Sequence, residues 1–298
     1  MNKTIDILIP VYNGAKYIKR CLDGIISQTY RNINVVILND GSADNSLEIL
    51  EEYEKKDERI RLYSKENEGF VSIARNYLLN KIESDYFIFV DVDDCVNQNY
   101  VSLLAEAIER TGAEIACCEY SITKSTLSKS SRIRGLKVYD SKDAIPQFVL
   151  GTRGHFMLWN KLIKTDLLQG LRFNEKINYG EDMFFILDIL QNSDITVASI
   201  SNRLYYYRVS NFSSISKGGL NQSKKAFLET MIKYESEDRY KSNTRVITTW
   251  IYLTAYYFEM LAIKSKDTDY IKYLRQLRDE RKDNIKEELQ RIILEQKL

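Results

Sequence analysis

Two hydrophobic patterns alternate along the first 120 residues of the chain. Nearly continuous apolar runs of four to seven residues are typical of strands that are buried on both faces of a sheet. Between these runs, apolar residues recur three and four positions apart, as they do in a helix with one buried face. The runs lie at residues 5–11, 33–38, 60–63, 86–90 and 115–118, and the helical stripes begin at Ile18, Leu47, Phe70 and Tyr100.

This alternation predicts an α/β fold, with a mostly parallel central sheet and helices on both of its faces. Sheets of this kind bind ligands in the crevice beyond the carboxyl ends of their strands. The strand ends are therefore where chemistry is expected.

The chain changes character near its C-terminal end. From about Lys224 the spacing of apolar residues is helical and the charges are mixed in sign. We expect a helical C-terminal region over residues 221–298, and we favour self-association through it to form a homo-oligomer. Partner docking and substrate positioning are the alternatives. The helical stripes comprise Tyr270, Tyr273, Leu274 and Leu277, followed by Ile285, Leu289, Ile292 and Ile293.

The longest uncharged stretch, Val246–Phe258, is shorter than the roughly 20 apolar residues that a membrane span needs. It predicts a buried helix. The alternative is an interfacial helix with peripheral membrane contact, because its tryptophan and tyrosines suit the headgroup boundary.

Composition excludes several classes of protein. Lys+Arg total 43 and Asp+Glu total 42, so the basic excess of a nucleic-acid binder is missing. His155 is the only histidine, which excludes a multi-histidine metal site. The four cysteines show no C-x-x-C spacing and suit a reducing cytoplasm. Asp6 interrupts the first apolar run, so no signal peptide is expected there.

The first two strands end in polar turns. Pro10-Val11-Tyr12-Asn13-Gly14 contains neither a dinucleotide fingerprint nor a P-loop. Tyr12 can stack on a base, although an ordinary turn would look the same. Asp40, in Asn39-Asp40-Gly41-Ser42, can accept a hydrogen bond from a ring N–H, although this segment also suits a helix-capping turn.

The segment after the third strand carries Asn67-Glu68-Gly69 and, on the next helix, Arg75. Arg75 can meet a base carbonyl or a phosphate, and its structural alternative is a surface salt bridge.

The fourth strand runs directly into Asp91-Val92-Asp93-Asp94. Carboxylates gathered at a strand end repel one another unless a cation joins them. Oxygen ligands without nearby cysteine or histidine favour Mg²⁺ or Mn²⁺, which usually takes further ligands from substrate phosphates. The alternative is helix capping by Asp94 or Asn97, with the other carboxylates solvated.

Taken together, these motifs resemble the family 2 glycosyltransferases with the GT-A fold. The resemblance covers roughly residues 4–216, and its specificity lies in the order of the motifs and their placement at strand ends. The matching segments are Ile9–Asn13, Asn39–Ser42, Asn67 and Gly69 with Ala74–Asn76, Asp91–Asp94, Trp159–Leu162 and Gly180–Asp182.

The resemblance implies a nucleotide-sugar-binding half over residues 1–120 and an acceptor-binding half of the same domain over 121–220. It implies that Asp91 and Asp93 contact the ribose and a Mn²⁺ or Mg²⁺ ion, and that Asp182 is the catalytic base of an inverting transfer. Residues matching Pro10, Tyr12, Asp40 and Arg75 hold the uracil of a UDP-sugar. The expected nucleotide-binding set also includes Val11, Asn13, Asn67, Gly69 and Val92.

Other candidates around this site are less specific. Asp182 and Glu181 open a predicted helix, where the helix dipole favours negative charge whatever their function. Trp159 can pack on a sugar or lie in the core, and Lys161 can meet phosphate or be solvated. Glu181, Trp159 and Lys161 are candidates for acceptor or phosphate contact. His155 is a candidate metal ligand, with an ordinary hydrogen-bonded histidine as the alternative.

The chain lacks the Q-x-x-R-W motif of processive synthases, since neither Trp159 nor Trp250 follows an arginine. The resemblance therefore implies a bacterial enzyme that adds one hexose or N-acetylhexosamine per encounter to a glycan acceptor. That acceptor would be a lipid-linked oligosaccharide or a glycan on a surface protein. We therefore expect the protein to be located in the cytoplasm, with the inner face of the membrane as the alternative. The alternatives are a non-catalytic nucleotide-sugar scaffold and a sugar nucleotidyltransferase, although the latter would need a glycine- and arginine-rich loop after the first strand.

Overall fold

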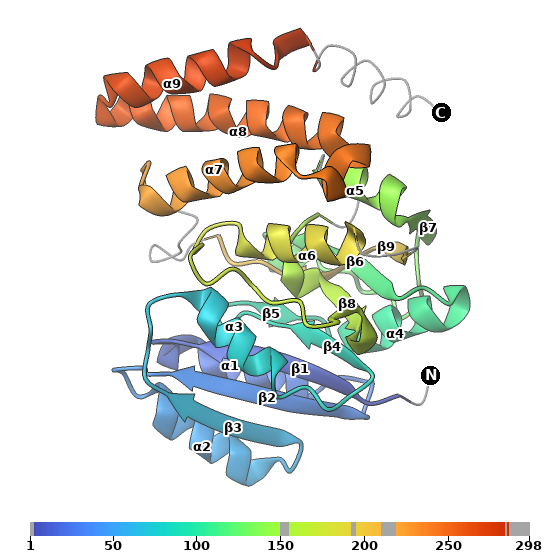
Figure 1. The fold of residues 1–298 in the computed structure, drawn as a ribbon. Coiled ribbons are helices and arrows are strands. Elements are labelled where there is room, and N and C mark those ends of the chain that lie inside the picture. The colour runs from blue at the N-terminus through green and yellow to red at the C-terminus, as the bar shows by residue number, and fades with distance from the viewer. Residues whose placement is uncertain (1–2, 150–154, 192–194, 210–218, 284, 286–298) are drawn as a thin grey trace. The chain divides into compact units, whose positions relative to one another are not determined.

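The computed structural model describes residues 3–149, 155–191, 195–209, 219–283 and 285, and the statements below concern these residues (Figure 1). The chain divides into two compact units. The first comprises Met1–Lys176 and Glu181–Asn211, and the second comprises Ile177–Gly180 and Phe212–Leu298. The expected helical region over residues 221–298 lies within the second unit.

The first unit is built on a nine-stranded sheet with helices on both faces (Figure 1). Four strands, in the order β3-β2-β1-β4, run parallel to one another. The order continues β8-β6-β9-β5, and β7 pairs with β9. The strands are β1 (Ile5–Val11), β2 (Ile33–Asp40), β3 (Ile60–Lys65), β4 (Tyr86–Phe89), β5 (Cys95–Val96), β6 (Ile115–Ser121), β7 (Lys137–Asp140), β8 (Lys161–Lys164) and β9 (Thr196–Tyr206).

The predicted α/β fold is confirmed, and so are the strands and helical stripes predicted within the first 120 residues. The sheet is more mixed than expected, because β8 runs antiparallel to β4 and β6, and β5 and β7 run antiparallel to β9. The helices of this unit are α1 (Ala15–Ile26), α2 (Ser46–Lys56), α3 (Val71–Leu79), α4 (Tyr100–Thr111), α5 (Ser141–Val149) and α6 (Glu181–Gln191), with short 3-10 turns η1 (Lys124–Thr126), η2 (Leu158–Asn160) and η3 (Thr165–Leu167).

The two faces of the sheet bury different sets of side chains. Alternate residues of β1 share one core cluster with the inner faces of α1 and α4. On β4, Phe89 contacts Phe173 edge-on, and Phe173 stacks on Phe185 of α6 at a centroid distance of 4.0 Å. Since successive side chains of a strand point to opposite faces, both faces are covered, as the apolar runs require.

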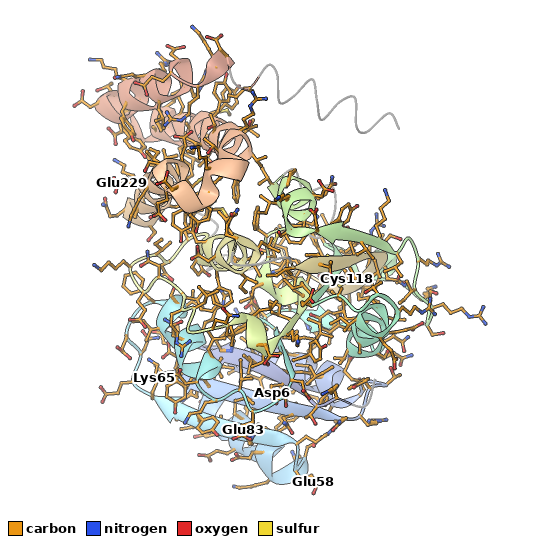
Figure 2. The ribbon with its side chains drawn as sticks, turned by 45° about the vertical axis from the view of Figure 1, so that its right-hand side comes forward. Asp6, Glu58, Lys65, Glu83, Cys118 and Glu229 are labelled. Atoms are coloured by element: carbon orange, nitrogen blue, oxygen red, sulfur yellow. The ribbon has the colours of Figure 1, made fainter. Side chains whose placement is uncertain are left out.

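Asp6 is the one acidic residue inside the first apolar run, and it is fully buried. Its carboxylate accepts hydrogen bonds from the backbone N–H groups of Glu83 and Ser84, at 2.7 and 3.1 Å, and from Asn34 Nδ2 at 2.8 Å (Figure 2). A buried carboxylate is tolerated where such donors replace water. Asp6 therefore ties the start of β4 to β1 and β2, at the end of the sheet opposite the candidate site.

The second unit contains α7 (Gln222–Ser236), the 3-10 turn η4 (Asp238–Asn243), α8 (Thr244–Ser265) and α9 (Thr268–Asp279). The predicted stripe on α9 buries Leu274 and Leu277. Of the next predicted stripe, Ile285 is buried, whereas Leu289, Ile292 and Ile293 lie outside the described residues. Among the described helices, α8 is long and apolar enough to cross a membrane, and half of its most apolar window is buried inside the fold. A core helix of a soluble protein passes the same test.

Gly41 is the position where the fold most clearly needs a glycine. Its φ is +67°, and a Cβ there would lie 2.5 Å from the backbone nitrogen of Asn67. We expect Gly41→Ala to destabilise the protein by more than the roughly 1–2 kcal/mol that a left-handed conformation costs an ordinary residue, because backbone must also move. Urea unfolding measures the effect.

Gly69→Ala is the matched control for Gly41→Ala. Gly69 also has a positive φ, +87°, but a Cβ there meets nothing within 4 Å. Its substitution should cost only the conformational part, about 1–2 kcal/mol. Equal destabilisation by the two substitutions would contradict the predicted clash at Gly41.

Candidate active site

The ends of β1 and β2 are joined by hydrogen bonds between their following loops. The backbone N–H of Asn13 donates to Ser42 Oγ at 3.0 Å, and the Ala43 N–H donates to Asn13 Oδ1 at 2.8 Å. Asn13 has a positive φ of 50°, which asparagine tolerates better than most residues. Tyr12 is left 55% exposed. Of the neighbouring candidates, Pro10 is half-buried and Val11 lies in the core.

Asp40 lies with Asn67 and Gly69, two other members of the expected nucleotide-binding set. Lys65 Nζ is 2.6 Å from Asp40 Oδ1 (Figure 2). Asn67 Nδ2 donates a hydrogen bond to Asp40 Oδ2 at 2.8 Å. Asn67 Oδ1 in turn accepts from the Gly69 N–H at 2.8 Å. The carboxyl ends of parallel strands meet at one sheet edge, which brings these residues together.

Arg75 projects from α3 and is 5% exposed. Its guanidinium forms an ion pair with Glu181 and lies 3.4 Å from Asp91 Oδ1. The rings of Phe89 and Phe173 lie within 6 Å of it. The salt bridge expected as the structural alternative is thus present, but buried, and it joins the end of β4 to the start of α6.

The acidic segment after β4 places several carboxylates close together. Burial raises the pKa of Asp91 to about 6, against the opposing charge of Arg75, and Asp93 and Asp182 raise it further. Burial raises the pKa of Asp94 to about 8, with further contributions from Asp91 and Asp93. The smaller contributions, those of the neighbouring carboxylates, are the mutual repulsion that the sequence predicted, and a cation would relieve it.

Asp94 is a residue whose position the sequence did not reveal. It is 1% exposed, and its Oδ1 accepts from the backbone N–H of Arg208 at 2.7 Å, just beyond β9. Arg20 Nη2 donates to the backbone carbonyl of Asp93 at 2.7 Å. The segment is therefore held from β9 and from α1. Val92, another candidate, packs against Gly14. A Cβ added at Gly14 would lie 3.1 Å from Val92 Cγ1.

Asp182 lies in the first turn of α6, and its Oδ1 accepts from the Met183 N–H at 2.9 Å. The negative charge of Asp182 contributes to raising the pKa values of Asp91 and Arg75. It also opposes the lowering of the Lys161 pKa by burial. Next to it, burial raises the pKa of Glu181 despite the ion pair with Arg75. The predicted base is thus near the acidic segment of β4.

The described residues contain no group of three or more His, Cys, Asp or Glu arranged to hold a metal ion. The fit to a divalent cation rests instead on Asp91 and Asp93, an oxygen-only pair. Mg²⁺ is commonly held by one or two carboxylates together with substrate phosphates, so this donor set fits Mg²⁺ or Mn²⁺.

His155 lies with Glu119 rather than with these carboxylates. Its Nε2 is 3.7 Å from Glu119 Oε2, and its ring meets Tyr120 edge-on at 5.1 Å. These contacts, with one carboxylate and one aromatic ring, correspond to the expected alternative of an ordinary hydrogen-bonded histidine.

Trp159 is 4% exposed and stacks with two tyrosines of the β9 region. Its ring lies 4.2 Å from that of Tyr205 and 5.4 Å from that of Tyr207. The structure thus places Trp159 in the core, which was the structural alternative. The hydroxyl of Tyr205 also accepts a hydrogen bond from the Asp91 N–H at 3.2 Å, which links this aromatic cluster to the acidic segment.

Lys161 is fully buried, and so it is neither solvated nor open to phosphate. Its Nζ donates to the carbonyls of His155 and Met157, at 2.5 and 2.7 Å, and to Asn160 Oδ1 at 2.8 Å. Burial lowers its pKa to about 8. Three donors meet three acceptors, so the side chain holds the turn before β8 in place.

We expect Lys161→Met to destabilise the protein by about 1–3 kcal/mol, because buried carbonyl acceptors lose their donor. Lys164→Met on the same strand is the control, since the Lys164 side chain is partly exposed and its ammonium forms an ion pair with the exposed Asp166 at 3.3 Å. Its effect should stay within about 0.5 kcal/mol. A selective loss of UDP binding by Lys161→Met without loss of stability would instead indicate phosphate contact.

Asn76 was part of a matched motif but had no assigned role. Its Nδ2 donates to the Phe173 carbonyl at 3.0 Å and to Glu175 Oε1 at 2.9 Å, and its Oδ1 accepts from the Phe173 N–H at 2.8 Å. It thereby fixes the segment that places Phe173 beside Arg75. The signal in the sequence that could have indicated this role is the position of Asn76, directly after the candidate residue Arg75.

Comparison with known proteins bears on this arrangement directly. Residues 6–190 match the family described as Glycosyl transferase family 2. The chain belongs to this family. It is 36% identical over 214 residues to glycosyltransferase GlyA of Streptococcus pneumoniae serotype 4, a match that covers 69% of this chain and 30% of GlyA. The family membership therefore concerns the matched domain, since the chain spans less than half of that relative.

Solved structures of glycosyltransferases show the same fold. Residues 1–349 of S. aureus TarS in complex with UDP-GlcNAc match with a TM-score of 0.68 and 18% identity, over 95% of this chain and 89% of that one. Glucosyl-3-phosphoglycerate synthase from Mycobacterium tuberculosis, in complex with Mn²⁺, UDP and glucosyl-3-phosphoglycerate, matches with a TM-score of 0.55 and 15% identity, over 78% of this chain and 80% of that one. The expected GT-A type fold of this family 2 domain is thus confirmed.

Proposed function

We propose that this protein is an inverting, metal-dependent glycosyltransferase that moves one hexose or N-acetylhexosamine from a UDP-sugar to a hydroxyl group of a glycan acceptor. The observation that carries the proposal is the buried network in which Arg75 joins Asp91, at the end of β4, to the first turn of α6. It brings the acidic segment and Asp182 to one site. The neighbours crystallised with UDP-GlcNAc and with UDP and Mn²⁺ support the donor class.

The nucleotide would lie along the strand ends of β1, β2 and β4. Tyr12 is exposed there and offers a ring to the base, while Asp40 offers a carboxylate held by Asn67. Pro10, Val11, Asn13, Gly69 and Val92 complete the proposed set as loop-forming or packing residues around these two. Arg75 belongs to the set through its ion pair with Asp91.

Asp91 and Asp93 would hold a Mn²⁺ or Mg²⁺ ion, which when bound supplies positive charge to the diphosphate leaving group. Asp182 accepts the proton of the acceptor hydroxyl as that oxygen attacks the anomeric carbon. Attack from the side opposite the diphosphate inverts the configuration. Glu181, neutralised by Arg75, keeps the guanidinium in place next to Asp91.

The proposed acceptor class comes from the family resemblance of the sequence motifs. A lipid-linked oligosaccharide or a glycan on a surface protein fits a bacterial enzyme that works in the cytoplasm or at the inner face of the membrane. The burial of Trp159 and Lys161 favours structural roles for both, so direct acceptor contact is not proposed for them.

The test is UDP release across a panel of UDP-Glc, UDP-GlcNAc, UDP-Gal and UDP-GalNAc, with Mn²⁺ and with EDTA. Release from one donor that is lost with EDTA is the expected result, and it would name the sugar. If no donor releases UDP, calorimetry with UDP and Mn²⁺ decides. Metal-dependent UDP binding would support the donor site, whereas its absence would overturn the proposal and favour a scaffold role.

A further inference from the structure

The outer face of α8 is apolar, although it is exposed. Five large side chains of this helix are between 43% and 53% exposed. Their spacing of three, one, three and three residues places them on one side of the helix. They are Leu253, Tyr256, Tyr257, Met260 and Ile263, and we call them the α8 outer face.

The opposite side of α8 is fully used by the fold. Ile251, Ala255, Phe258 and Ala262 are completely buried. α8 is also the middle helix of this unit, since it contacts both α7 and α9 (Figure 1). A helix that has already buried one face in a soluble unit normally turns polar residues outward. The α8 outer face therefore serves a contact that the described residues of this unit do not provide.

The exposed charges of α8 itself have one sign. The helix, all of whose residues are described, contains a single acidic residue, Glu259. Glu259 is buried and forms ion pairs with Arg275 and Arg278 of α9. Lys264 and Lys266, both exposed, follow the last apolar residue of the face.

The basic residues also reach the aromatic part of the face. The Arg278 guanidinium lies 5.0 Å from the centre of the Tyr256 ring and 5.4 Å from that of Tyr252. The Arg275 side chain is 61% exposed. An apolar, tyrosine-bearing strip edged by lysine and arginine, without an exposed carboxylate on the helix, is complementary to an anionic, amphipathic surface.

We propose that the α8 outer face docks on the surface of a bilayer that contains anionic lipids, with α8 lying in the plane of the interface. A spanning orientation is incompatible with the burial of half of the apolar window and with the ion pairs of Glu259. A second copy of the chain is a poorer occupant, because α8 of that copy exposes no carboxylate that could pair with the basic residues along this face. Tyrosine rings suit the headgroup region, where one end is wet and the other apolar.

The experiment is co-sedimentation of the full chain with vesicles of phosphatidylcholine alone, or with a third of the lipid replaced by phosphatidylglycerol. The chain should bind the anionic vesicles and release them at high salt. Met260→Ser with Ile263→Ser should lower the partition coefficient at least about tenfold, because less apolar area enters the interface. Lys264→Glu should lower it about fivefold or more.

The control is Ile122→Ser with Val138→Ser, a pair of exposed apolar residues of the first unit that are 58% and 49% exposed. This pair should leave vesicle binding unchanged. Because all substituted residues are exposed, thermal midpoints should match the wild type, and UDP release without vesicles should be unaffected by the α8 variants. That readout separates this inference from the proposed function.

Three outcomes would overturn the inference. One is no binding to anionic vesicles, and another is binding that the α8 variants do not weaken. The third is a dimer in light scattering that Met260→Ser with Ile263→Ser dissociates, which would assign the face to a second copy.

Discussion

Asp182→Asn is expected to lower the rate of sugar transfer by about 10²–10⁴, because a carboxamide cannot accept the proton of the acceptor hydroxyl. The affinity for UDP should stay nearly unchanged, since Asp182 lies on α6 and not on the strand ends that would hold the nucleotide. Its hydrogen bond from the Met183 N–H can be kept by the asparagine oxygen, so the fold should be retained. Transfer rates with saturating donor and calorimetry with UDP measure the two effects.

Asp166→Asn serves as the control for this variant. Asp166 is a highly exposed aspartate of the same unit, paired only loosely with Lys164 at 3.3 Å. It should transfer sugar at the wild-type rate. If Asp182→Asn retained full activity, the catalytic base would have to be another group.

Asp93→Ala is expected to lower UDP release by about 10³, because the charge that the ion supplies to the leaving diphosphate is worth several kcal/mol. Addition of Mn²⁺ should then no longer strengthen UDP binding, whereas it should do so in the wild type. Calorimetry with UDP, with and without Mn²⁺, reads this difference separately from the transfer rate.

Asp85→Ala is the matched control at the opposite end of β4. Asp85 is half-exposed and bonded to Lys3 at 2.9 Å. Its removal should leave the response to Mn²⁺ intact. A response that also persisted in Asp93→Ala would show that the metal, if used, is held by other residues.

The parallel half of the sheet could be predicted from sequence because it depends on local patterns. Runs such as Ile33–Leu38 are buried on both faces, and burial of this kind leaves a continuous apolar signature. The antiparallel pairs could not be predicted in the same way. β5 has two residues and β7 four, and neither has a pattern that identifies its partner β9.

The candidate site divides along a similar line. The gathering of Asp40 and Asn67 at one edge could be predicted, because both follow strands of a parallel sheet and such strands end at one edge. The environments of Trp159 and Lys161 did not, since residue type does not tell whether a lysine finds three carbonyl acceptors inside the fold. Likewise, Arg75 reads as a surface cation until the topology places Glu181 beside it, 106 positions away.

The sharing of the Arg75 guanidinium by two carboxylates, Asp91 and Glu181, constrains the evolution of the sequence at these three positions. One buried cation offsets the negative charges of both Asp91 and Glu181. Loss of the arginine would therefore leave two buried carboxylates without a positive partner. A substitution at any one of these positions should therefore be strongly epistatic with the other two. Lineages that alter one of the three should be found to have altered a second, and sequential single steps between such states should be rare.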